Sequence, residues 1–302
     1  EKVISLDGVK VRQEGKRTGE GGGRRGQFNQ SFGILPIAKS NHPRFDDWEL
    51  PGHGEPYIDC GVTYVRGCEN VGRHPAGVDG RPEGAVFVQL YRRTCARAEC
   101  PVCYESWASK ESLKADHRLK GYKAPKFRRP IHVIVSVSIE DWEKDISILR
   151  RLLYKYVKKV GVSGGCAIFH PYREEEGSGR WYFSPHFHIV GYGWVVATDR
   201  LFELTGWVVK NAGVRKSVRA TLMYQLSHAG VRKGRHTITW FGACSYNKLV
   251  VAPLVVEKPR CPMCGAELKP LPESLIAGLD PPPELGDYFW TSELGLREWL
   301  DE

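Results

Sequence analysis

The stretch Ser184-Pro185-His186-Phe187-His188-Ile189-Val190 alternates polar and apolar side chains in the way that a β-strand does. On a strand, side chains two residues apart point to the same face of the sheet. His186 and His188 therefore share one face, while Phe187 and Ile189 pack on the other. Two neutral imidazoles on one rigid face form the beginning of a site for a divalent metal ion.

The residues around this stretch predict an α+β domain with a central antiparallel sheet. Alternating apolar residues indicate a strand over 131–137. Ser138 and Asp141 then resemble a capping box at the start of an amphipathic helix that reaches Val160. We expect further strands at 166–172, at the histidine stretch, and at 206–210, 237–241 and 249–256, with a second helix at 216–228. This order of elements indicates helices packed on one face of the sheet.

A third metal ligand is predicted in the strand before the histidine pair. His170 stands near the end of that strand, and the polar loop 173–180 makes a hairpin with the histidine strand. Such a hairpin places His170 close to His186 and His188. The glutamate run 174–176 is a second source of a ligand, although such a run is also typical of a solvated loop.

A nucleophile is predicted on the helix over 216–228. Leu222, Leu226 and Ala229 can pack toward the sheet, which leaves Tyr224 on a different arc where it projects toward the metal. A tyrosine hydroxyl is a weak nucleophile at neutral pH and needs activation. A metal ion with three protein ligands can hold the scissile phosphate and stabilise its charge. Attack by Tyr224 then gives a phosphotyrosine and releases a 3′-hydroxyl.

Three features of the chain resemble the rolling-circle replication initiators of the HUH endonuclease superfamily. Residues 185–190 look like the HUH motif, two histidines around one hydrophobic residue, and a helical tyrosine, Tyr224, follows it. The strand over 131–137 resembles the family's first motif. The cysteine cluster within 94–107 looks like that of initiators from archaeal plasmids and viruses. The resemblance covers the layout of residues 60–256 and implies an HUH nuclease domain.

The resemblance also implies an activity. It implies a single-tyrosine enzyme that uses Mg²⁺ or Mn²⁺, nicks single-stranded DNA at a replication origin, forms a 5′-phosphotyrosine with a free 3′-OH, and rejoins strands. Many relatives carry a lysine three residues after the tyrosine, whereas Ser227 followed by His228 stands here. Tyr246 is therefore an alternative nucleophile. An HUH-type transposase and a non-enzymatic zinc-ribbon DNA-binding regulator are alternative functions.

The nine cysteines fall into two clusters and a singleton, Cys166, which we expect to be a small buried residue of its strand. The first cluster predicts a closed structural Zn²⁺ site with four ligands. Its thiolates are Cys95, Cys100 and Cys103, with Cys60 or Cys68 as the fourth and His74 or His117 as outside candidates.

A second zinc turn is predicted at Cys261 and Cys264, which precede Gly265. Cys244 is the cysteine nearest to it along the chain, and His236 or His228 would complete the set. An odd number of cysteines with two such turns indicates metal binding in a reducing compartment, so we expect a cytoplasmic protein of a prokaryote or of a virus-infected cell.

The charge of the chain favours a polyanionic partner. The 302 residues carry a formal net charge of +9, with a pI near 9.1, and nucleic acid is the usual partner of such a chain. A basic linker can contact phosphates or serve as a solvated hinge. Its main cations are Lys123, Lys126, Arg128 and Arg129. A run of 18 apolar residues does not occur in the sequence, so we expect no membrane partner.

Four segments are predicted along the chain. They are a basic N-terminal arm with loops (1–55), a zinc-binding segment (56–125), an HUH endonuclease core (126–256) and a zinc-knuckle-like tail (257–302). The chain begins at Glu1 rather than Met, so we expect it to be a piece of a longer protein. A helicase, or a domain outside this chain, is a further expected partner.

Overall fold

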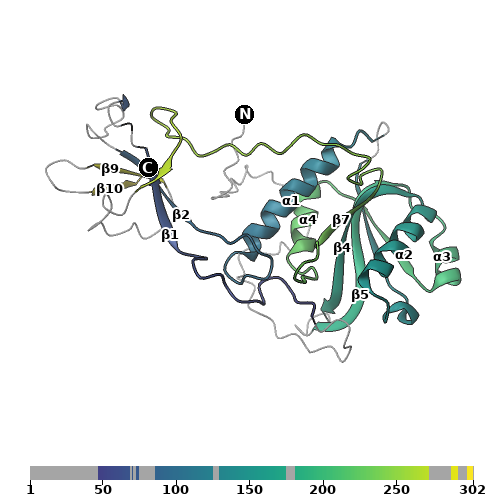
Figure 1. Cartoon of the computed structure of the whole chain (residues 1–302). Coiled ribbons are helices and arrows are strands. Elements are labelled where there is room, and N and C mark those ends of the chain that lie inside the picture. Colours follow the sequence, from purple (N-terminus) through teal and green to yellow (C-terminus); the bar gives the residue numbers. More distant parts are fainter. Residues whose placement is uncertain are drawn as a thin grey trace, which may run out of the picture. The chain divides into compact units, whose positions relative to one another are not determined.

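A computed structural model describes residues 47–68, 70, 73–74, 86–124, 129–174, 181–271, 287–291 and 298–301. Most of the predicted N-terminal arm and the side chains of Lys126, Arg128, Glu175 and Glu176 lie outside these residues. The chain folds into two compact units. Each unit contains a five-stranded sheet whose neighbouring strands are all antiparallel (Figure 1).

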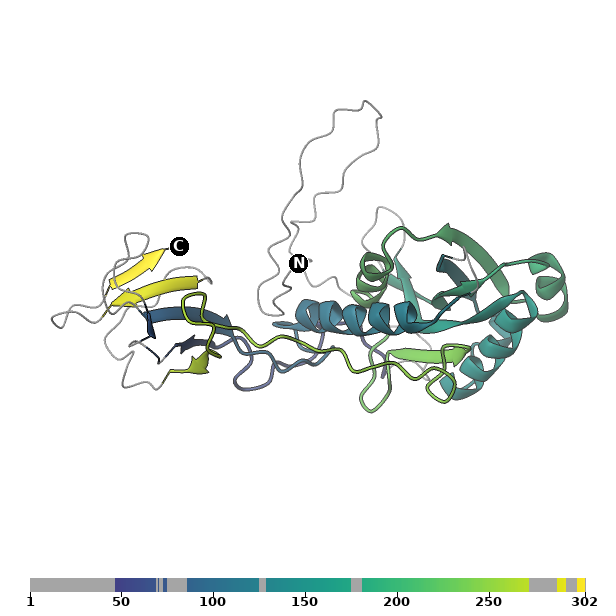
Figure 2. The same cartoon turned by 90° about the horizontal axis from the view of Figure 1, so that it is seen from above.

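The sheet of the first unit joins two distant parts of the chain. Its order is β10-β9-β2-β1-β8, and Figure 2 shows the yellow C-terminal strands beside the dark blue ones. The strands are β1 (Thr63–Gly67), β2 (Val86–Arg92), β8 (Lys269–Pro270), β9 (Asp287–Thr291) and β10 (Glu298–Asp301). The zinc-binding segment and the C-terminal tail, expected as separate segments, thus share one sheet.

The second unit contains the histidine strand at the centre of its sheet, whose order is β6-β3-β5-β4-β7. Its strands are β3 (Ile131–Ser136), β4 (Val162–Glu174), β5 (Trp181–Gly193), β6 (Val208–Val214) and β7 (Ile238–Gly242). Its helices are α1 (Tyr104–Gly121), α2 (Ile146–Lys159), α3 (Thr198–Thr205) and α4 (Val218–Leu226), with a short 3₁₀ turn at Ile139–Asp141. The α+β class and the antiparallel sheet agree with the sequence.

The predicted hairpin forms between β4 and β5. In its register His170 lies opposite His186, and Ile168 lies opposite His188. On the other side of β5, Ile134 of β3 pairs with His188. Because opposite residues of an antiparallel pair share a face, the hairpin sets all three predicted ligands on one face of the sheet.

Helices cover both faces of this sheet, so the prediction of helices on one face is wrong. Figure 1 shows α1 and α4 on one side of the strands and α2 and α3 on the other. The α2 face buries Phe187 and Ile189 against Leu149 and Leu153. The opposite face buries a second cluster under α1 and α4, which includes Ile168, Val190, Leu119, Leu222 and Leu226. Both faces of β4 and β5 are therefore apolar around the histidines.

The start of α2 also differs from the prediction. Ser138 makes no side-chain cap bond, and residues 139–141 form the 3₁₀ turn instead. The carboxylate of Asp141 accepts a hydrogen bond from the indole nitrogen of the buried Trp207 at 2.5 Å. The helix begins after Asp145, whose carboxylate accepts from the backbone N–H of Ser147 at 2.7 Å. Asp141 therefore bonds to Trp207, 66 residues away, rather than to the start of a helix, and α2 begins several residues later than predicted.

Two further elements were misassigned. The expected strand over 249–256 does not form, because side chains of α1 occupy its backbone: Arg118 donates to the Leu249 carbonyl at 2.8 Å, and a ring nitrogen of His117 lies 2.9 Å from that of Ala252. Helix α3 was not predicted, and it is held at the sheet by the single buried side chain of Leu201. Within the described residues, helices long and apolar enough to cross a membrane do not occur.

Asp145→Ala should lower the free energy of unfolding by about 1 kcal/mol, because it removes the N-cap of α2. The bond from Ser147 lowers the pKa of Asp145 in the folded state. The stabilisation is therefore present above the ordinary pKa of the carboxyl, about 4, and is lost as the pH falls through the lower folded pKa. Urea denaturation at pH 7 and pH 3 measures both effects. Ser138→Ala is the control, and an equal loss for both variants would contradict the assignment of the cap.

Candidate metal centres

Three histidines of the second unit come together on the face of the sheet under α1 and α4. One ligand nitrogen from each of His170, His186 and His188 lies within 4.8 Å of the others. Their ring centroids are 4.4 Å (His170 to His188), 5.0 Å (His186 to His188) and 5.2 Å (His170 to His186) apart. The spacing follows from the β4–β5 register, and it brings together the three residues that were predicted from the sequence to be metal ligands.

Of the three histidines, His170 is the one whose burial is not compensated by a hydrogen bond to a described residue. Its side chain is fully buried, and neither ring nitrogen has a hydrogen-bond partner among the described residues. A buried polar group without a partner costs about 1–3 kcal/mol. Burial, followed by the neighbouring histidines and Arg173, also holds the pKa of His170 well below its usual range. The ring is therefore neutral at pH 7, with an open lone pair.

The other two rings are held in place by hydrogen bonds of their own. A ring nitrogen of His186, Nδ1, lies 2.8 Å from the Ser184 carbonyl. Because a carbonyl only accepts, Nδ1 carries the hydrogen, and the lone pair of Nε2 is left for a ligand. The Nδ1 atom of His188 lies 2.8 Å from Nε2 of His132. Arg215 donates to the other nitrogen of His132 at 2.8 Å, which fixes that ring in turn.

The charge state of the cluster suits a divalent cation. Burial is the main cause that lowers the pKa of His186 to about 3, and it also lowers that of His188. Three neutral imidazoles on a sheet form a ligand set that first-row divalent metals accept. The one lone pair of the neutral His170 ring, which has no hydrogen-bond partner among the described residues, fits such an ion.

A fourth histidine, His228, connects this cluster to the predicted nucleophile. It follows α4 directly, and its ring centroid lies 4.6 Å from that of His170 and 4.8 Å from that of Tyr224. Burial lowers the pKa of His228 to about 4, so this ring is also neutral at pH 7. The side chain of Tyr224 is 58% exposed. Tyr224 therefore stands at the surface, and the ring of His228 separates it from the candidate metal ligand His170.

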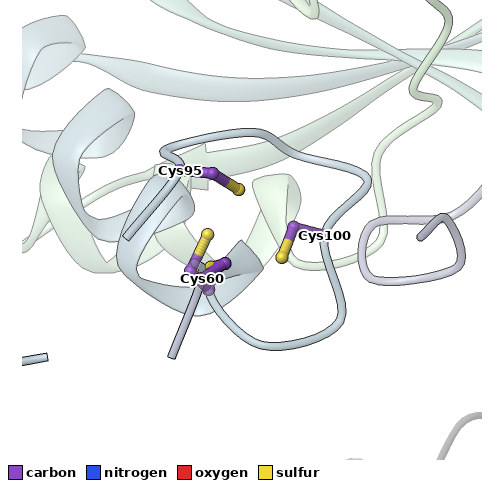
Figure 3. A group of neighbouring side chains, drawn as sticks. Cys60, Cys95 and Cys100 are labelled. Carbon is purple, nitrogen blue, oxygen red and sulfur yellow. The ribbon is translucent and has the colours of Figure 1, made fainter. Parts of the chain in front are cut away.

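The first cysteine cluster contains Cys60, Cys95, Cys100 and Cys103, whose sulfur atoms lie within 4.8 Å of one another. Figure 3 shows the side chains of Cys60, Cys95 and Cys100 turned toward a common point. The turn that carries Cys100 runs straight into α1, because the Tyr104 N–H donates to the Cys100 carbonyl at 3.0 Å. Four thiolates at this spacing suit a closed tetrahedral zinc site.

The second cluster contains Cys68, His74, Cys261 and Cys264. The sulfurs of Cys68 and Cys264 are 3.4 Å apart, and that of Cys261 lies 3.4 Å from Nε2 of His74. The turn is closed by a bond from the Cys261 N–H to the Ala266 carbonyl at 2.8 Å. Gly265 adopts a φ of +71°, a conformation that glycine adopts without strain. This Cys₃His set also suits zinc.

These groupings correct the predicted ligand sets. Cys60 belongs with the first cluster and Cys68 with the second, and His74 joins the second cluster as well. Cys244, expected in the second cluster, is instead buried in the apolar core under α1 and α4. His236 is exposed on the loop before β7. The ligand sets were predicted from proximity along the chain. That criterion failed because β1 pairs with β8, which brings Cys68 next to Cys264, 196 residues further along the chain.

The remaining predicted site residues lie elsewhere. Cys166 is fully buried in β4, as expected. Lys123 and Arg129 are exposed at the ends of the basic linker. Tyr246 lies against Arg118, whose guanidinium carbon is 4.4 Å from its ring centroid.

Three residues around the histidines were not predicted from the sequence: His132, Arg173 and Arg215. A fourth, His228, was expected as a ligand of the second cysteine cluster, and it lies against His170 instead. His132 could have been found from the sequence, because it is a histidine in an otherwise apolar strand and lies on the same face of that strand as Ser136.

Comparisons of the chain with protein-family models, with curated proteins and with solved structures gave no match.

Each cysteine cluster should hold one zinc ion. Cys264→Ser should release the ion of the second cluster and leave that of the first in place, because the two ligand sets share no residue. Cys244→Ala changes a cysteine outside both sets and should leave the zinc content unchanged. Elemental analysis of the purified variants measures this. A loss of zinc in Cys244→Ala would contradict the corrected grouping.

The protein without added divalent metal should lose stability in mild acid. The folded pKa values of the buried histidines lie below the ordinary value of 6.5, so the unfolded chain binds more protons as the pH falls below 6.5, and this favours unfolding down to the folded pKa values. His228→Asn should reduce the loss between pH 7 and pH 5 by up to about 2 kcal/mol. Urea denaturation at both pH values measures it, with the exposed His236→Asn as control.

Proposed function

We propose that the protein is a metal-dependent endonuclease that nicks single-stranded DNA at a replication origin and rejoins the strands, as an initiator of rolling-circle replication. The observation that carries the proposal is the arrangement of three buried, neutral histidines behind an exposed tyrosine, with His228 in contact with both. The resemblance of residues 185–190 and Tyr224 to the HUH initiators supports the choice of DNA and of the origin.

The histidines suit a cation rather than a purely structural role. A bound Mg²⁺ or Mn²⁺ would supply Lewis-acid stabilisation of the charge on the scissile phosphate. His170 and His186 would hold it through ring nitrogens whose lone pairs have no partner among the described residues. His188 would join them by exchanging its bond with His132 for the ion, because Arg215 donates to Nδ1 of His132 and the neutral His132 therefore donates from Nε2 to Nδ1 of His188. Arg173 lowers the pKa of all three by its charge, so it lies close enough to attract a phosphate to the same place. Its side chain is anchored by Ser136 at 2.8 Å and Ser184 at 3.1 Å.

Tyr224 is the proposed nucleophile. Its phenolic oxygen attacks the phosphorus of the scissile phosphodiester, a bond forms between the two, and the bond from phosphorus to the 3′ oxygen breaks. The phenol gives up its proton, and the departing 3′ oxygen takes one up and becomes the free 3′-OH. The reverse reaction by another 3′-OH joins strands and releases Tyr224. Because α4 packs on the sheet through Leu222 and Leu226, the helix can aim the tyrosine at the metal centre.

The two cysteine clusters have a structural role in this proposal. Four protein ligands leave a zinc ion no open position for a substrate. The first cluster leads directly into α1, and the second fastens the turn after Arg260 to the end of β1. A zinc-ribbon regulator without activity would also use such clusters, but it gives no account of the partnerless ring of His170.

Tyr224→Phe should abolish a covalent protein–DNA adduct. The assay incubates labelled single-stranded DNA that contains the origin region with protein and Mn²⁺, and mass spectrometry identifies the modified residue and the DNA end. The matched variant Tyr246→Phe, which alters the other exposed candidate, should form the adduct normally. His186→Ala should reduce adduct formation by a factor of about 100 or more, since it removes a metal ligand.

The outcomes separate the alternatives. An adduct that persists in Tyr224→Phe and disappears in Tyr246→Phe would transfer the nucleophile to Tyr246. Absence of any adduct from the zinc-loaded wild-type protein, with DNA binding intact, would favour the non-enzymatic regulator. Circular dichroism of His186→Ala checks that a loss of activity does not come from unfolding.

A further inference from the structure

A groove of about 570 Å³ lies in the second unit, between α1 and the chain around β7. One wall is a single face of α1, where Trp107, Glu111, Lys114 and Arg118 follow one another at helical spacing. The other wall is the chain on either side of β7, at residues 231–240 and 246–254. Apart from Tyr246, the alternative nucleophile, the groove uses none of the residues assigned above to metal binding or to catalysis.

The groove is lined by more cations than anions. Its charged residues are Lys114, Arg118, Arg232, Lys233 and Arg235 against Glu99 and Glu111. Both carboxylates already have cationic neighbours, since Glu111 pairs with Lys114 at 2.7 Å and Glu99 lies 3.8 Å from Arg97. Lys233 and Arg235 are exposed and form no ion pair with a carboxylate of the described residues. Arg232 pairs with Asp47 at 2.5 Å. The charges of Arg118, Lys233 and Arg235 therefore remain available to a ligand.

Aromatic rings stand among these cations. The guanidinium of Arg118 lies over Trp240, 5.1 Å from the ring centroid, and over Tyr246 at 4.4 Å. Arg118 cannot swing away easily, because it donates to the carbonyls of Cys244 at 3.2 Å and Leu249 at 2.8 Å. Tyr246 is 72% exposed. A fixed cation next to exposed rings suits a ligand that carries both phosphates and flat bases.

The groove also adjoins the metal centre along the chain. Arg232 follows His228 by four residues, so the backbone between them spans at most about 14 Å. The intervening backbone is fixed by bonds from Gly230 N–H to the Phe169 carbonyl at 2.8 Å and from Val231 N–H to the Glu49 carbonyl at 2.9 Å. The wall of the groove at Arg232 therefore lies close to His228, which contacts both His170 and Tyr224.

We propose that this groove binds the single-stranded DNA on one side of the scissile phosphate. Lys233 and Arg235 contact the phosphates, and the exposed ring of Tyr246 stacks on a base. The proposal rests on the proposed function for its choice of DNA as the ligand. A duplex is a poorer fit, because stacking on Tyr246 requires a base that is free of a helix. The basic run RKGRH at 232–236, which belongs to none of the motifs described above, thus has a role in binding.

The experiment measures fluorescence anisotropy with a labelled single-stranded oligonucleotide of about 16 nucleotides. No Mg²⁺ or Mn²⁺ is added, so that binding is read without cleavage. The double variant Lys233→Glu, Arg235→Glu should bind at least about tenfold more weakly at about 0.1 M salt, and its affinity should depend less on salt. The control, Arg151→Glu with Lys155→Glu, makes the same change of charge on α2, on the opposite face of the sheet. It should bind within about twofold of the wild type.

Tyr246 is tested separately. Tyr246→Ala should weaken binding by about five- to a hundredfold, while Tyr246→Phe should bind like the wild type because it keeps the ring. Zinc content and the thermal midpoint of each variant confirm that it is folded.

Equal binding by the groove variant and the α2 control would overturn the proposal, and so would equal affinity for a duplex of the same length. These results are distinct from a failure of the nuclease assignment. If the wild-type protein binds through the groove but forms no tyrosine adduct, only the proposed nuclease function is contradicted. If the wild-type protein forms the adduct while the groove variants bind DNA normally, only the proposed role of the groove is contradicted.

Discussion

The burial of three imidazoles side by side, in a group that contains no carboxylate of the described residues, is the constraint that orders the second unit. Desolvation disfavours the charged form of each ring, so the cluster is neutral at pH 7. Neutral rings do not repel one another strongly, and they can lie 4.4–5.2 Å apart. The cost is the loss of water around His170, whose nitrogens have no partner. A cation at the cluster would remove part of that cost, because it would take the lone pair of one of these nitrogens.

The surrounding elements keep these rings in one arrangement. The β4–β5 register sets the spacing of His170 and His186, and a different register would move the histidines to the other face. Apolar residues on both faces of β4 and β5 then hold the hairpin between two layers of helices. Side chains from other strands complete the support: Arg215 orients His132, and His132 orients His188. The site is thus carried by the centre of a sheet rather than by loops, which suits the precise placement that catalysis needs.

The first unit differs from the second in how little regular structure its described residues contain. Its strands are short, and long strands or helices are absent from its described residues. A small sheet of this kind buries little apolar surface. Metal clusters can replace the missing core, because their binding free energy contributes directly to folding. The Cys68–Cys264 contact joins parts of the chain 196 residues apart, so the second cluster also holds the ends of the unit together.

Several features could be predicted from the sequence alone because they depend on local patterns. The strand over 131–137, the hairpin with His170 opposite His186, the helix with Tyr224, and the α+β class all follow from periodicity in short windows. The ligand sets could not be predicted in full, since Cys60 and Cys68 are both candidates near Cys95 along the chain. The pairing of β1 with β8, which the sequence does not signal, assigned Cys68 and His74 to the second cluster. Likewise, the placement of His228 between Tyr224 and His170, and of α1 against residues 231–254, required packing between distant segments. Local periodicity thus located most of the strands and helices of the second unit, whereas tertiary contacts decided where α2 begins and which side chains from distant segments meet.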